Sequence, residues 1–65
     1  SPLDSDIIEY LSRVATTASE EEIHRQVHKG QQGRTLPLVR VALAKLVQGG
    51  LVDKINGQYR LACGG

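Results

Sequence analysis

The chain has 65 residues, of which 40% are hydrophobic, and its formal net charge at pH 7 is +1. This length supports one small domain with a thin core and leaves little room for a substrate pocket, while the hydrophobic share excludes a disordered segment. No apolar run approaches the roughly 18 residues of a membrane span and no signal peptide is visible, so we expect no membrane partner.

Cys63 is the single cysteine. It can form no internal disulfide and no thiolate metal site, and we interpret it as incidental rather than catalytic. A reducing, intracellular location (cytoplasm or nucleus) fits this usage best. Ser1-Pro2 and Gly64-Gly65 resemble linker ends and indicate a module of a larger protein.

Charge is unevenly distributed along the chain. Residues 1–22 hold six acids and one base, which gives −5, and residues 23–65 hold seven bases and one acid, which gives +6. Two interpretations stay open. The basic half is one property of proteins that bind a polyanion, whereas acids also gather at helix N-termini because the helix dipole favours them there.

The first predicted helix runs from about Asp6 to Val14. A cap at residue 4, 5 or 6 can begin it, and the spacing of its apolar residues indicates one buried stripe, formed by Ile7, Ile8, Leu11 and Val14. The β-branched pair Thr16-Thr17 predicts a connection or a very short strand over residues 15–18.

Ser19 and Glu22 have the spacing of a capping box, which predicts a second helix from there to about Lys29, ended by Gly30. It buries Ile23 and Val27. Residues 30–35 form a polar loop with two glycines.

A third helix begins near Pro37 and ends at Gly49-Gly50, one of which is expected to take the left-handed conformation that terminates helices. Its core stripe is Val39, Leu43 and Leu46, flanked by Ala42 and Val47.

Residues 51–62 read as a β-hairpin around Asn56-Gly57, because a type I′ turn favours this dipeptide. A two-residue turn pairs Val52 with Leu61, and the pairing continues to the turn as Asp53 with Arg60, Lys54 with Tyr59 and Ile55 with Gln58. The face with Val52, Tyr59, Leu61 and the Lys54 stem is expected to cover the helices.

Three helices followed by a hairpin, with Val39 to Leu46 leading into Gly50-Leu51-Val52, resemble the winged helix-turn-helix. The predicted class is therefore α+β: one winged-helix domain over residues 1–65, with a core from about 5 to 62 and a C-terminal two-stranded wing. The loop before the third helix is longer than the turn of a compact helix-turn-helix.

The resemblance implies nucleic-acid binding, with DNA favoured over RNA, in which the outward face of the third helix enters the major groove. The positions opposite its core stripe are mostly unable to hydrogen-bond to bases: Pro37, Val41, Ala44 and Gln48. We therefore expect phosphate contacts rather than sequence reading, made by Arg34, Arg40, Lys45 and Lys54.

The alternative is a protein partner. An exposed apolar face on the third helix, formed by Pro37, Leu38, Val41 and Ala44, favours burial against another protein.

The sequence shows no arrangement typical of an enzyme, and we expect no catalytic residue, metal or cofactor. His24 and His28 lie four residues apart on the second helix, but they lack further ligands and are interpreted as solvent-facing. Residues 30–33 lack the Lys-Ser/Thr of a phosphate-binding loop.

Overall fold

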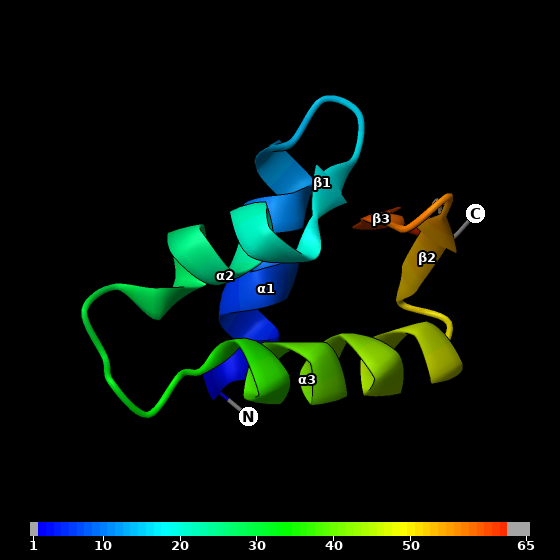
Figure 1. Ribbon diagram of the computed structural model, residues 1–65. Coiled ribbons are helices and arrows are strands. Elements are labelled where there is room, and N and C mark those ends of the chain that lie inside the picture. Colours follow the sequence, from blue (N-terminus) through cyan, green and yellow to red (C-terminus); the bar gives the residue numbers. More distant parts are fainter. Residues whose placement is uncertain (1, 63–65) are drawn as a thin grey trace.

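The computed structural model describes residues 2–62, so predictions about Ser1, Cys63 and Gly64-Gly65 lie outside the described residues. The elements follow the order α1 (Pro2–Arg13), β1 (Ala18–Ser19), α2 (Glu20–His28), α3 (Leu36–Gln48), β2 (Val52–Ile55) and β3 (Gln58–Leu61) (Figure 1). The class is α+β, as expected, and the arrangement is compatible with a winged helix. In this part of the chain no helix has both the length and the apolarity to cross a membrane.

Helix α1 starts earlier than predicted, at Pro2 rather than near Asp6. Proline has no N–H to lose in a first turn, and Asp4 in that turn complements the helix dipole. The longer helix adds Leu3 to the apolar stripe, four residues before Ile7. The expected cap at residue 4, 5 or 6 is therefore wrong, because all three residues lie inside the helix.

The sheet has three strands, in the order β1-β3-β2, and not the two of a simple hairpin. The third strand is β1, whose two residues pair antiparallel with Tyr59 and Gln58 of β3. A contact between the side chains of Thr17 and Gln58 adjoins this pairing. Two residues are too few to show an alternating pattern, so only the position of β3 makes this segment a strand.

The predicted capping box is confirmed. The Ser19 hydroxyl accepts a hydrogen bond from the Glu22 N–H at 3.2 Å, and the Glu22 carboxylate accepts one from the Ser19 N–H at 3.2 Å. Helix α2 ends at His28, and its C-cap Lys29 already takes a left-handed conformation (φ 49°) before Gly30.

Helix α3 begins after Thr35, with Pro37 in its first turn, and three backbone hydrogen bonds close its end, the first from the Gly49 N–H to the Lys45 carbonyl at 2.9 Å. The Leu51 N–H donates to the Leu46 carbonyl at 2.9 Å and the Gly50 N–H to the Val47 carbonyl at 3.0 Å. Gly50 has φ +80°, so the expected left-handed residue is the second glycine.

The hairpin has the predicted register in all four pairs. Asn56 (φ 51°) and Gly57 (φ 79°) both have positive φ, as a type I′ turn requires.

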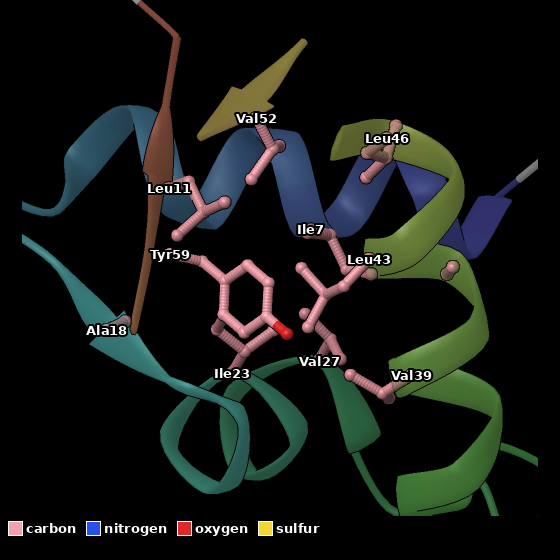
Figure 2. Close-up of a cluster of buried hydrophobic side chains, with 11 residues drawn as sticks. Ile7, Leu11, Ala18, Ile23, Val27, Val39, Leu43, Leu46, Val52 and Tyr59 are labelled. Carbon is pink, nitrogen blue, oxygen red and sulfur yellow. The ribbon is translucent and has the colours of Figure 1, made fainter. Parts of the chain in front are cut away.

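One hydrophobic core joins the helices to the sheet. Figure 2 shows side chains from α1, α2, α3 and β2 around the ring of Tyr59, which comes from β3. The predicted stripe of α3 is buried, and Leu43 and Val39 are fully enclosed. The buried hydrophobic residues are Ile7, Leu11, Ala18, Ile23, Val27, Val39, Ala42, Leu43, Leu46, Val52 and Tyr59.

Leu43→Ala is expected to lower the free energy of unfolding by about 2–5 kcal/mol, because it leaves a cavity among residues that cannot collapse into it. A domain of this size has a total of about 3–10 kcal/mol, so much of the population would unfold. Urea denaturation followed by circular dichroism measures the change. Val41→Ala, on the exposed face of the same helix, is the control, and an equal loss in both variants would contradict the assigned core face.

Candidate functional site

The outward face of α3 is the main apolar surface of the described residues. It consists of Pro37, Leu38, Val41 and Ala44, all exposed as the sequence predicts, with 50% of Leu38 and 52% of Val41 accessible. These two side chains lie three residues apart, so they project from the same side of the helix. Across residues 2–62 the other exposed large hydrophobic residues are Leu51 and Ile55, which lie outside α3.

A shallow groove of about 250 Å³ runs beside this face, between α3 and the start of α1; we call it the α3 groove. The first turn of α1 forms its second wall, and that turn was missed in the sequence because the helix was expected to begin later. The residues that line the groove are Leu3, Asp4, Leu38, Val41, Ala42 and Lys45.

Arg34, a predicted phosphate contact, is held inside the fold. Its guanidinium donates to the Asp6 carboxylate at 2.5 Å and to the Val27 carbonyl at 2.9 Å, and only 12% of its side chain is exposed. Lys29 lies 3.9 Å from the same carboxylate. Through these interactions the Arg34 side chain connects the loop before α3 to α1 and to the end of α2.

These interactions lower the pKa of Asp6 below its ordinary value of 3.8. The hydrogen bond from Arg34 is the largest cause, partial burial acts in the opposite direction, and the charges of Lys29 and Arg34 add to the lowering. The Asp6 carboxylate is therefore ionised in the folded protein at neutral pH, and it offsets the positive charges of Arg34 and Lys29.

Arg40, the second predicted contact, has an internal partner as well. Its Nε donates to Glu20 Oε1 at 3.4 Å, and the Tyr59 hydroxyl donates to Glu20 Oε2 at 3.2 Å. Burial, followed by the Glu20 carboxylate, raises the pKa of the Tyr59 phenol, which keeps its proton for this bond. Half of the Arg40 side chain remains exposed.

Lys45 and Lys54 have no ion pair with another residue in the described chain. The Lys54 ammonium lies 5.8 Å from the centre of the Tyr59 ring, in a cation–π contact, and Lys45 lies at the edge of the α3 groove. The loop that holds Arg34 and the strand that holds Lys54 adjoin opposite ends of α3, about 20 Å apart (Figure 1). The four predicted cations are therefore spread along the helix rather than gathered at one point.

The charge asymmetry of the sequence is partly matched inside the fold. The acids Asp6 and Glu20 of the N-terminal part pair with Arg34, Lys29 and Arg40 of the C-terminal part. The first turn of α2 also carries Glu20, Glu21 and Glu22. A helix N-terminus normally attracts phosphate, and three carboxylates there oppose it.

The two histidines were expected to face solvent, but both are partly buried. They form hydrogen bonds to the loop before α3. The His24 Nε2–H donates to the Arg34 carbonyl at 3.0 Å, and His28 Nδ1 accepts from the Gly30 N–H at 3.2 Å. Their rings meet edge to face at 5.2 Å. Over residues 2–62 there is no group of three side chains suited to hold a metal ion.

A larger hollow, of about 490 Å³, lies at the other end of the molecule between the end of α1 and β3. It is lined mostly by small apolar and hydroxyl side chains, and its one charged residue, Arg60, lies 3.8 Å from Asp53. The α3 face is the better candidate site despite its smaller groove, because the large apolar side chains of Leu38 and Val41 are half exposed there, whereas no large hydrophobic residue of the hollow is exposed.

Comparisons with known proteins do not extend this picture. No model of a protein family matches the chain, and neither the curated proteins nor the solved structures give a match.

Asp6→Asn is expected to destabilise the protein at pH 7, because Arg34 then loses its carboxylate. The lowered pKa in the folded state means that this stabilisation is present above the unfolded-state value, near 3.9, and is lost as the pH falls through the folded-state value. Thermal melting from pH 7 to pH 2.5 should therefore show wild type and variant converging in acid. Asp53→Asn, which removes a more exposed pair, is the control with little effect; parallel curves for wild type and Asp6→Asn would contradict the assignment.

Proposed function

We propose that this chain is a winged-helix module that binds another protein through the outward face of α3. The observation that carries the proposal is the pair Leu38 and Val41, each half exposed on one side of the helix and bordered by the α3 groove. Burying such side chains against a partner supplies binding free energy from the hydrophobic effect.

The electrostatics favour a protein over a nucleic acid. Two of the four predicted phosphate contacts, Arg34 and Arg40, already bind carboxylates, and a phosphate would have to displace or share these partners. The acidic first turn of α2 adds repulsion near Arg40. The outward face of α3 also places valine and alanine where hydrogen bonds to base edges would be needed.

Nucleic-acid binding is the second candidate function. It is favoured by the ammonium groups of Lys45 and Lys54, which have no carboxylate partner within residues 2–62, and by the exposed half of Arg40. In this candidate the three cations, with Arg34 released from Asp6, bind phosphates along α3 and the wing.

The double variant Leu38→Ser/Val41→Ser is expected to abolish binding of peptides selected from a random displayed library on the wild-type domain. About half of each side chain is exposed, so a partner that buries it gains about half of the free energy of full burial. Removing one side chain should therefore weaken binding about tenfold, and removing both about a hundredfold. Fluorescence anisotropy with the selected peptides measures this. Leu51→Ser, which removes an equally exposed leucine outside α3, is the matched control. A library that yields no binder, or binders that tolerate the double variant, would refute the proposal.

Titration of the labelled domain with a generic 16-base-pair duplex separates the two candidates. At about 20 mM salt, where attraction to phosphate is strongest, we expect no displacement of the amide signals of α3 or the wing. Displacements that Lys45→Gln and Lys54→Gln diminish would establish the second candidate instead.

A further inference from the structure

The charged side chains of α3 are of one sign. The helix contains Arg40 and Lys45 and no aspartate or glutamate. Lys45 lies one turn beyond Val41, a rise of about 6 Å along the helix, and borders the α3 groove. Across residues 2–62 it has no ion pair, so its ammonium is available to a bound molecule.

Arg40 adds a second, partly available cation. One of its N–H groups, Nε, is directed to Glu20, whereas an arginine has five donors. Half of its side chain is exposed. Its exposed half therefore adds positive charge beside the outward face of α3, while Glu20 keeps its Nε.

These charges disfavour a second copy of the chain as the occupant. Two α3 faces placed together would bring Arg40 and Lys45 against the same cations of the other copy, and like charges across an interface cost free energy. Asp4 is the single carboxylate that lines the groove, and it lies on the α1 side.

The backbone of the site indicates the conformation of the partner. The peptide groups along α3 are already hydrogen-bonded within the helix, and backbone hydrogen bonds close its C-terminal end. An extended peptide would find no ladder of backbone partners there, whereas a helix satisfies its own backbone and presents side chains at i, i+3 and i+4. Helix α3 has 13 residues, about 20 Å, which matches a partner helix of similar length.

We infer that the partner segment is an acidic amphipathic helix: its apolar side chains pack on Leu38 and Val41 and enter the α3 groove, and a carboxylate of this helix binds Lys45. This inference rests on the proposed function and specifies the chemistry of its partner.

Two designed 14-residue peptides test the inference. Both have leucines at i, i+3, i+4 and i+7; the acidic peptide has glutamates beside this stripe, and its twin has lysines at the same positions. Fluorescence anisotropy at 50 mM salt should show the acidic peptide binding about tenfold more tightly, and the difference should shrink at 300 mM salt. The amide signals of Leu38, Val41 and Lys45 should move on binding.

Charge variants test whether the preference for the acidic peptide depends on α3. Lys45→Gln should remove most of it and Lys45→Glu should reverse it, whereas Lys54→Glu makes the same charge change on β2 and should leave it intact. Because Lys45 lies in the last turn of α3, its substitution can disturb the helix. Circular dichroism is therefore used to check that each variant is folded. The neutral Lys45→Gln variant keeps the test available if Lys45→Glu unfolds.

The two proposals fail separately. Equal affinities for the two peptides, or no binding of either by a domain that binds library-selected peptides, overturn the acidic helix and leave the proposed function standing. A dimer in sedimentation equilibrium that Leu38→Ser/Val41→Ser dissociates also overturns the acidic helix, in favour of a second copy. Failure of the library selection overturns the proposed function.

Discussion

The ion pair between Arg34 and Asp6 connects three parts of this small fold. Arg34 lies in the loop before α3, Asp6 lies on α1, and the second hydrogen bond of the guanidinium goes to Val27 near the end of α2. A seven-residue loop with two glycines has considerable conformational entropy, and this contact fixes where α3 begins. The position of α3 decides which of its side chains enter the core, and hence which remain on the surface.

The same ion pair bears on function. A partly buried charge that keeps its partner is not readily offered to a ligand, because breaking the pair leaves both charges without this partner. Glu20 acts similarly for Arg40 while it also accepts a hydrogen bond from Tyr59. These two arginines thus stabilise the packing of α3 on α1 and α2 instead of serving a phosphate-binding surface. The apolar residues on the outward face of α3 therefore remain its most prominent exposed feature.

Local patterns were sufficient for much of the fold. The capping box at Ser19, the Asn56-Gly57 turn with its register, and the buried stripe of α3 were all predicted, because each depends on residues at most a few positions apart. The start of α1 was misplaced by four residues, although Pro2 and Asp4 carry the signal for an earlier start. The candidate face of α3 was predicted residue by residue, but the groove beside it was not.

The sequence by itself determined the three helices, the hairpin and the exposed apolar face of α3, since helical and strand periodicities follow from backbone geometry alone. Only the tertiary structure decided that β1 is a strand, that Leu3 and Asp4 wall the α3 groove, and that Arg34 and Arg40 have internal partners. The pairing of β1 with β3 and the two ion pairs join residues between 20 and 41 positions apart. Local pattern predicted the pairing of Asp53 with Arg60 within the hairpin, but the pairs between distant parts of the chain depend on how the helices pack.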